Sequence, residues 1–481
     1  MTIGNSVRSI GDYAFSYCRS LTSVTIPNGV TSIGEYAFCN CSGLASITIP
    51  TSVTSIGAWA FAECNWVITL YISDLMAWCK SLPGGVVMNP HGGVNLYLNG
   101  NKVTTLTIPG SVTSIKSYAF YCFNGLTSVT IPDSVTSIGS AAFSHCKDLT
   151  SVKIGNGVKS IGDEAFCYCS GLTSVTIPSS VTSIGNGTFG GNQLVVLKVA
   201  TDNPSYKAVS GLLLTKDGKT LVAVPGGLAS VTIPDSVTSI GERAFYNSSG
   251  LTSVTIPDSV TSIEEKAFYG CSSLTRVTVP DSVTGIGEWA FYYCSGLTNV
   301  TIGNSATRIG AYAFCECRRL ASVIFKGNAL RVGNSAFSYV GSGCTAYVKE
   351  SSTGWGVEIP GMWNRLNIQY MTPEMEWLVD RGLTADARAA NGRTAAECYV
   401  LGLDPADATN DFRIVSIELV DGKPKVEWEP KMNRWTGAEI QAVLKGAETL
   451  GGPWEDVLAD GGSPGTARPT MRFFKVVVEM P

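Results

Sequence analysis

Apolar residues recur along most of the chain in one repeated pattern. Residues 126–146 read LTSVTIPDSVTSIGSAAFSHC, with large apolar residues at positions 1, 4, 6, 10, 13 and 18 of this unit. The Phe of position 18 returns every 23 residues in three runs: Phe15, Phe38 and Phe61; Phe120, Phe143, Phe166 and Phe189; Phe245, Phe268, Phe291, Phe314 and Phe337. Such a fixed period predicts a solenoid of stacked coils.

The pattern within one unit predicts the path of the coil. Apolar side chains at positions 4 and 6 alternate with hydroxyls at 3 and 5, which is typical of a short half-buried strand. Pro132 ends this strand, and Val135 and Ile138 predict a second short extended piece. Gly139 permits a bend, and we expect one helical turn to direct Phe143 inward. A single coil buries too few apolar side chains to offset its conformational entropy, so coils must stack.

Two segments interrupt the period. The spacing is 59 residues between Phe61 and Phe120, and 56 between Phe189 and Phe245, which places inserts in degenerate coils near 66–106 and 190–228. The first insert predicts a helix capped by Ser73 or Asp74, followed by a hairpin that turns at Asn99–Gly100. The second predicts a hairpin around Asp217–Gly218.

The repeated unit LTSVTIPDSVTSIGSAAFSHC and its copies resemble the BspA-like bacterial leucine-rich repeats. The resemblance covers residues 1–371 and includes both inserts and the closing segment STGWGVEIPGMWNRLNIQY, within a cap at about 344–371. It implies a curved leucine-rich-repeat array with short parallel strands, in a secreted or cell-surface protein involved in adhesion or protein binding. It provides no catalytic residues.

The N-terminal sequence MTIGNSVRSIGDYAF starts partway through a repeat and has no signal-peptide pattern. We therefore expect the chain to be truncated at its N-terminus. An extracellular or cell-surface location rests on the resemblance.

The character of the chain changes at Thr372. Residues 372–481 carry 18 acidic and 12 basic side chains, against 20 and 22 in residues 1–371. Helical patterns over 373–407 and β-rich patterns over 412–481 predict a small α+β or β-sandwich domain, which resembles C-terminal modules of surface proteins of anaerobic bacteria. Within it, NGRTAAECYVLGLDPAD (391–407) resembles the calcium-loop-plus-helix segment of dockerin-like repeats. Cys398 replaces the last loop carboxylate, which favours a structural helix and no metal.

Composition excludes several functions. Charged residues make up 15% of the chain and the net charge is −4, so there is no basic stripe for nucleic acid. No apolar run is long enough to span a bilayer. We find no nucleophile motif, phosphate loop or metalloprotease motif, and predict neither an enzyme nor a cofactor. The acidic pairs Asp163/Glu164 and Glu264/Glu265 are expected to be solvated on an outer turn.

Fifteen cysteines raise the question of redox or metal chemistry. Most lie at or beside position 21, and they predict a structural ladder of buried thiols: Cys18, Cys41, Cys64, Cys146, Cys169, Cys271, Cys294 and Cys317, with Cys122 offset by one. Disulfides between neighbouring coils are the alternative, because the coil spacing suits their Cα separation. The C-x-C pairs Cys39/Cys41, Cys167/Cys169 and Cys315/Cys317 lie several coils apart, so they cannot together form a zinc site.

Aromatic residues near positions 16, 19 and 20 give the clearest binding signal. Aligned coils would place them in a stripe along the flank or the convex side: Tyr13, Tyr17, Tyr36, Trp59, Tyr118, Tyr121, Tyr168, Tyr246, Tyr269, Trp289, Tyr292, Tyr293 and Tyr312. Such rows anchor protein or glycan partners. Two alternatives stay open: the rings pack on one another, or the Ser and Thr rows of positions 2, 3 and 5 form the site.

These patterns together predict a non-enzymatic surface or secreted repeat protein. Its expected partner is a host or neighbouring-cell surface protein. A carbohydrate-binding module and an architectural spacer without a specific ligand are the alternatives.

Overall fold

A computed structural model describes residues 1–64, 69–81 and 93–380, together with the backbone of five later strands. The chain divides into two compact units, Met1–Tyr370 and Met371–Pro481. In the second unit, the helix α2 (Pro373–Asp380) precedes two separate antiparallel groups of strands. They are β34 (Arg413–Val420) with β35 (Lys423–Glu429), and β36 (Gln441–Ala447) between β37 (Glu455–Asp456) and β38 (Phe473–Glu479). The predicted calcium-loop segment 391–407 lies outside the described residues.

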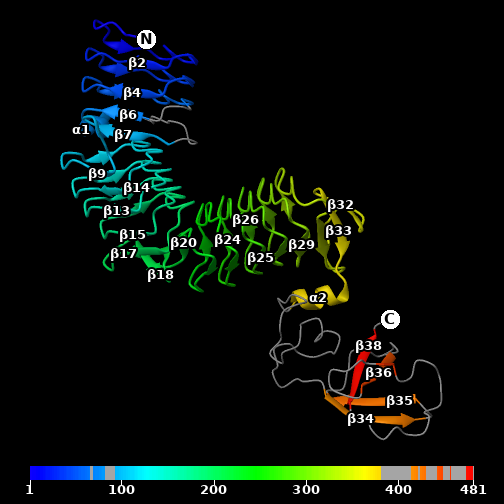
Figure 1. Ribbon diagram of the computed structural model, residues 1–481. Coiled ribbons are helices and arrows are strands. Elements are labelled where there is room, and N and C mark those ends of the chain that lie inside the picture. Colours follow the sequence, from blue (N-terminus) through cyan, green and yellow to red (C-terminus); the bar gives the residue numbers. More distant parts are fainter. Residues whose placement is uncertain are drawn as a thin grey trace. The chain divides into compact units, whose positions relative to one another are not determined.

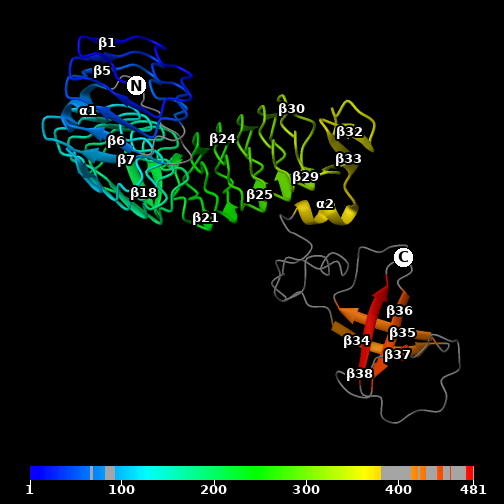
Figure 2. The same ribbon diagram turned by 45° about the horizontal axis from the view of Figure 1, so that its top comes forward.

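The first unit is a solenoid whose coils have three sides (Figure 1; Figure 2). On the first side, short strands are formed mainly by positions 3–6. They are β2 (Ser23–Thr25), β4 (Ser46–Ile49), β6 (Thr69–Ile72), β7 (Asn95–Leu98), β8 (Asn101–Lys102), β9 (Thr105–Thr107), β11 (Ser128–Thr130), β13 (Ser151–Lys153), β15 (Ser174–Ile177), β17 (Val196–Val199), β21 (Ser230–Thr232), β23 (Ser253–Thr255), β25 (Arg276–Val279), β27 (Asn299–Ile302), β29 (Ser322–Phe325), β31 (Thr345–Val348), β32 (Gly361–Trp363) and β33 (Leu366–Tyr370).

The second side consists mostly of two-residue strands at positions 12 and 13. They are β1 (Ser9–Ile10), β3 (Ser32–Ile33), β5 (Ser55–Ile56), β10 (Ser114–Ile115), β12 (Ser137–Ile138), β14 (Ser160–Ile161), β16 (Ser183–Ile184), β18 (Tyr206–Val209), β19 (Leu212–Thr215), β20 (Thr220–Ala223), β22 (Ser239–Ile240), β24 (Ser262–Ile263), β26 (Gly285–Ile286), β28 (Arg308–Ile309) and β30 (Arg331–Val332). Repeat strands pair in parallel with a 23-residue offset, for example Val129 with Val152. The predicted parallel-strand solenoid is thus confirmed.

The third side, positions 15–21, corrects the prediction of a helical turn. In a helix every amide would donate to a carbonyl of its own coil. Here some amides donate to the next coil and others to a carbonyl of their own coil. The Tyr36 and Phe38 amides donate to carbonyls of the next coil, at 3.1 and 2.7 Å. The Cys39 amide donates to the Tyr36 carbonyl in its own coil at 3.0 Å. This alternation requires a left-handed backbone at positions 16 and 20, and we call this surface the turn side.

Position 18 forms the centre of the core. The Phe rings stack between coils with centroid separations such as 5.3 Å for Phe38–Phe61 and 4.4 Å for Phe245–Phe268. All five rings from Phe245 to Phe337 are buried. At the C-terminal end of this unit, Trp355 and Trp363 pack edge-on against Phe325 and close the core. Because the rings inside each 23-residue run contact both neighbours, the stability of one coil there depends on the next.

The first insert replaces a second-side strand with a helix. The predicted helix is α1 (Leu75–Ser81), and Asp74 is its cap, since its Oδ1 accepts the Met76 and Ala77 amides at 2.8 and 3.1 Å. The α1 residue Trp78 is buried, and its Nε1 donates to the Ala119 carbonyl at 2.8 Å. The predicted hairpin is also present, because β7 and β8 pair antiparallel around Asn99–Gly100.

The second insert bends the solenoid. The coil that follows Phe189 supplies β17 and then β18, β19 and β20 on the second side, with the predicted hairpin between β19 and β20. Its chain then passes through Val224–Gly227 directly to β21, without a turn segment. The turns on either side therefore meet, and the Gly191 amide donates to the Tyr246 carbonyl at 3.1 Å. The strand sides of this coil hold additional strands, β17 to β20, whereas the turn side gains no segment. The solenoid therefore bends toward the turn side (Figure 1). We call this bend the elbow.

Candidate binding surface

The aromatic residues predicted from the sequence all lie on the turn side, where they form several clusters. On the N-terminal arm, Tyr13 stacks on Tyr36 with ring centroids 5.0 Å apart. A second chain of contacts runs Trp59–Tyr118–Tyr121–His145–Tyr168, with separations from 6.4 to 4.5 Å. Beyond the elbow, one connected cluster comprises Tyr246, Tyr269, Trp289, Tyr292, Tyr293 and Tyr312. The sequence predicted a stripe along the flank or the convex side. Because the solenoid bends toward the turn side, the clusters near the elbow lie instead on its inner, concave surface.

Packing between rings leaves part of this surface open to solvent. Tyr13, Trp59 and Tyr293 expose 59%, 40% and 45% of their surface, whereas the other residues of the clusters are partly buried by their neighbours. Tyr17 and Tyr339, at the two ends of the array, are also exposed. The rings thus pack on one another and still offer contact area.

Many of these aromatic residues have an unusual backbone. Tyr36, Trp59 and Trp289 at position 16, and Tyr293 at position 20, have φ between 50° and 58°. The left-handed region costs an ordinary residue about 1–2 kcal/mol, and glycine takes it freely. Gly187 stands at position 16 in another coil with φ of 64°. Large rings are therefore retained where the backbone alone would favour glycine.

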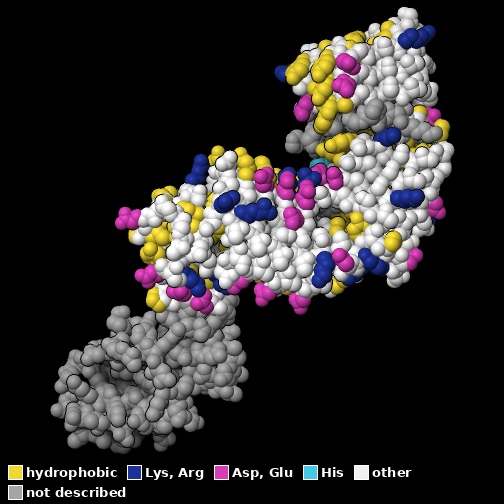
Figure 3. Space-filling view, turned by 180° about the vertical axis from the view of Figure 1, so that it is seen from behind, with side chains coloured by type: hydrophobic (Ala, Val, Ile, Leu, Met, Phe, Trp, Pro, Cys, Tyr) yellow, Lys and Arg dark blue, Asp and Glu magenta, His cyan; other side chains and the backbone are white. Residues whose placement is uncertain are grey.

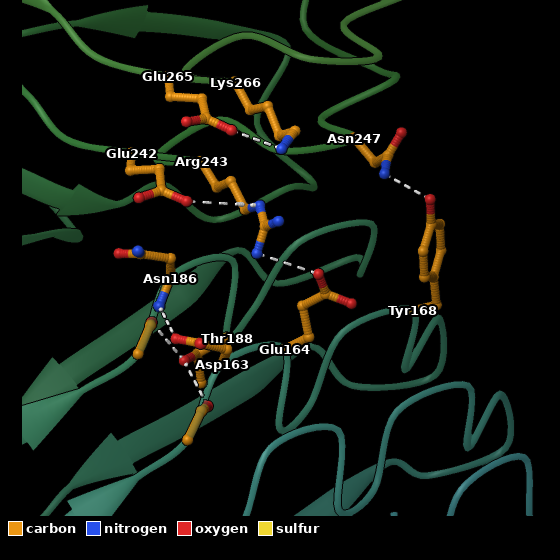
Figure 4. A network of polar contacts seen from close by, with 12 residues as sticks. Asp163, Glu164, Tyr168, Asn186, Thr188, Glu242, Arg243, Asn247, Glu265 and Lys266 are labelled. Carbon is orange, nitrogen blue, oxygen red and sulfur yellow. Dashed lines mark hydrogen bonds and ion pairs between the residues drawn. The ribbon is translucent and has the colours of Figure 1, made fainter. Parts of the chain in front are cut away.

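Charged side chains fill the inner surface of the elbow (Figure 3). The elbow cluster consists of Asp163, Glu164, Glu242, Arg243, Glu265 and Lys266 (Figure 4). Arg243 bridges the two arms: its Nη1 lies 3.2 Å from Glu164 Oε1, and its Nε lies 3.8 Å from Glu242 Oε1. Lys266 Nζ lies 2.6 Å from Glu265 Oε1. The sequence predicted that Glu164 and Glu265 are solvated on an outer turn, but both form ion pairs.

Two further contacts fix the elbow. Asn247 Nδ2 donates a hydrogen bond to Tyr168 Oη, which joins the two arms (Figure 4). Gly190 faces Tyr246 so closely that a Cβ atom there would lie 2.8 Å from the ring.

His145 is neutral at pH 7, because desolvation and the nearby Lys147 lower its pKa to about 4. Its Nδ1 lies 2.9 Å from Ser144 Oγ.

The predicted thiol ladder has a regular hydrogen-bonding pattern. Seven of its eight cysteines are buried, and Cys18 is exposed. Each buried Sγ donates to the Phe carbonyl of the preceding coil, for example Cys146 to Phe120 at 3.0 Å and Cys294 to Phe268 at 3.1 Å. The sequence indicated a space-filling role but not this donor role. Burial raises the pKa of Cys146 and Cys169, and the fourteen described cysteines are free thiols.

The hydroxyl rows of the strand sides are largely used within the scaffold. Thr127 and Thr136, at positions 2 and 11, donate through Oγ1 to the carbonyls of Thr104 and Thr113, both at 3.0 Å. The same bond recurs along the array, for example from Thr298. These hydroxyls follow the coil register and strengthen the stack, so we assign no selective recognition to them.

One aromatic pair was not predicted from the sequence. Tyr71 of β6 and Tyr97 of β7 lie side by side on the first side, with ring centroids 4.9 Å apart. They align in register with Thr25 and Thr48, the threonines found at this position in β2 and β4. The signal was present in the strand sequences TLYI and NLYL, where Tyr replaces Thr inside the first insert.

The described part of the chain offers no group of three or more His, Cys, Asp and Glu side chains arranged for a metal ion. Among the helices that the structure describes, none combines the length and hydrophobicity needed to cross a bilayer.

A three-sided solenoid with 23-residue coils defines a leucine-rich-repeat protein. The family described as the BspA type leucine rich repeat region matches residues 1–79, 93–206 and 226–342, with six copies. The chain belongs to this family.

Several solved structures are similar. A leucine rich cell surface protein from Faecalibacterium prausnitzii is 28% identical, with 68% of this chain and 87% of that chain covered and a TM-score of 0.45. The pneumococcal vaccine antigen PcpA is 19% identical, with 77% and 88% covered and a TM-score of 0.42. A leucine-rich repeat protein from Bacteroides ovatus is 24% identical, with 77% and 83% covered and a TM-score of 0.35. The comparison with curated proteins gave no match.

Proposed function

We propose that this chain is a non-enzymatic repeat protein that binds a protein partner on its inner turn surface, outside the cell or at its surface. Family membership supports protein binding in general. The observation that supports a site here is the elbow, where aromatic clusters on the two arms border a charged cluster on a concave surface. Buried aromatic rings and Arg are typical anchors of protein interfaces.

The variation between coils supports the turn side over the strand sides. Position 16 holds Trp59, Glu164, Lys266 and Trp289 in different coils, so this surface differs from place to place. The strand sides repeat Ser and Thr, and many of these hydroxyls bond to neighbouring coils. A selective partner needs a surface that is not the same at every coil.

The test uses a partner isolated with the full chain from surface-protein extracts and then purified. The variant Trp59→Asn/Tyr293→Asn removes two exposed rings while keeping a residue that tolerates the left-handed backbone. The matched control Thr255→Asn/Thr278→Asn changes two exposed residues of the first side. We expect the ring variant to weaken binding about tenfold or more and the control to leave it unchanged. Equal effects of both variants, or no partner at all, would favour the architectural spacer.

A second candidate function rests on Tyr71 and Tyr97. A pair of partly exposed rings on a hydroxyl-lined face is a platform on which a sugar ring can stack. The substitution Tyr71→Thr restores the residue found at this position in β4. A glycan array should show binding by the chain that this variant loses. An array without enrichment for any polysaccharide rejects this function.

A further inference from the structure

The charges at the elbow are strongly unbalanced. In the five coils from Phe166 to Phe291, positions 14–16 hold six carboxylates, namely Asp163, Glu164, Glu242, Glu264, Glu265 and Glu288. The same positions hold two cations, Arg243 and Lys266, so their sum is 2 − 6 = −4. Such a surface attracts cations, and aromatic rings lie directly beside it.

The protein's own two cations show how this surface holds positive charge. Arg243 contacts Glu164 and Glu242, and its guanidinium lies over the Tyr246 ring at 5.7 Å. Lys266 contacts Glu265, and its ammonium lies over the Trp289 ring at 5.9 Å. Each cation is thus held by a carboxylate at position 15 of its own coil and by an aromatic face.

The coil of Phe291 again has a carboxylate at position 15 and aromatic rings beside it, but it has no cation at position 16. Glu288 occupies position 15, is exposed, and forms no ion pair with the residues that the structure describes. Position 16 is Trp289, which stacks on Tyr312 at 4.5 Å and borders Tyr292 at 4.8 Å. Tyr293 adds a ring that is 45% exposed. This coil can therefore receive a cation from outside the chain.

We infer that the partner presents a segment rich in arginine and lysine, whose cations bind beside Glu288 and over the rings of Tyr293 and Tyr312. This rests on the proposed protein-binding function and names the chemistry of the partner. Charge complementarity favours a basic peptide segment, since an acidic or neutral one would meet uncompensated carboxylates.

A labelled peptide of alternating arginine and glycine tests this inference against the full chain by fluorescence anisotropy. The same peptide with citrulline in place of arginine keeps the shape and removes the charge. We expect only the arginine peptide to bind. Raising the ionic strength from about 0.01 M to 0.15 M should weaken binding strongly, because the Debye length falls from about 30 Å to about 8 Å.

The variant Glu264→Gln/Glu288→Gln removes two charges beside the elbow that form no ion pair within the described part of the chain. The control Asp235→Asn/Asp258→Asn removes two exposed charges at position 8 on the corner between the strand sides. We expect the first variant to weaken binding by about fivefold or more and the control by less than about twofold.

Equal affinity for the arginine and citrulline peptides, or equal effects of the two variants, overturns the inference. Suppose that a purified partner binds more weakly to the Trp59/Tyr293 variant but not to the Glu264/Glu288 variant. This result would overturn the inferred cationic segment and leave the proposed function in place. A partner that is insensitive to all four residues would reject the proposed function as well.

Discussion

The strand sides and the turn side of the solenoid come from the same coils but use their residues differently. On the strand sides, a threonine hydroxyl such as that of Thr136 donates to the coil before it, and the same bond recurs along the array. On the turn side, the backbone ladder and the Phe stack recur, while positions 15, 16, 19 and 20 change from coil to coil. The coil register therefore fixes the strand sides, whereas the turn side can vary while the fold stays the same.

The largest expected effect on stability comes from the Phe stack, which recurs in the coils of the turn side. Phe268 is fully buried and stacks on Phe245 and Phe291 at 4.4 and 4.9 Å. Phe268→Ala should lower the free energy of unfolding by about 3–5 kcal/mol, because it leaves a cavity between two coils. Chemical denaturation followed by circular dichroism measures this loss. The strand-side control Thr255→Ala should stay within about 0.5 kcal/mol, and similar losses for both would contradict the comparison.

The next effect concerns the elbow, where the turn sides of two coils meet. A Cβ atom at Gly190 would lie 2.8 Å from the Tyr246 ring and carbonyl, whereas one at Gly110 meets nothing within 4 Å. Gly190→Ala should cost about 1–3 kcal/mol by overpacking and should open the bend. Small-angle X-ray scattering should show a longer maximum dimension. Gly110→Ala should change neither quantity; an unchanged scattering profile for Gly190→Ala would show that the contact does not set the bend.

A smaller effect depends on pH. His145 stays neutral in the folded chain down to a pKa of about 4, while an unfolded His has a pKa of about 6.5. The unfolded state then binds more protons between these values, so stability should fall as pH drops from about 6.5 to 4. Allowing for partial solvent exposure, the loss is about 1–2 kcal/mol. His145→Asn places a residue found at this position in other coils, such as Asn40, and should remove the contribution. Identical pH profiles of denaturation for the two proteins would reject this role.

The smallest effect separates two threonines of the strand sides. Thr136→Val should cost about 0.5–1 kcal/mol, because it removes the bond to the Thr113 carbonyl while keeping the β-branched shape. Thr130→Val lies in β11, where its neighbours in register are Thr107 and Lys153, and should be nearly neutral. Thermal denaturation of both variants measures the difference. An equal response would mean that the hydroxyl bonds add no stability to the stack.

Much of the fold could be predicted from the sequence because the same constraint recurs in every coil. Val129, Ile131 and Phe143 show which positions are buried, and the 23-residue period shows that equivalent residues pair. The helical turn was wrong because local sequence does not show where an amide donates. The amide of Phe143 bonds to Ala165 in the next coil, at 2.8 Å, and so the segment needs neighbours to take its shape.

The candidate site was predicted only in part. Position in the repeat identified the aromatic residues, since those at positions 16, 19 and 20 must share one side. Their concave placement and the meeting of Tyr168 with Asn247, 79 residues apart, follow from the missing turn segment after Phe189. The spacing of 56 residues revealed an insert there but not which side of the coil it lengthened.

The sequence by itself determined the repeat, its core positions, its family and the identity of the aromatic residues, because periodic burial leaves a periodic pattern. Only the tertiary structure decided the alternating turns, the thiol-to-carbonyl bonds such as Cys294 to Phe268, and the elbow that joins Glu164 to Arg243. These features depend on contacts between coils, and such contacts exist only when the coils are stacked.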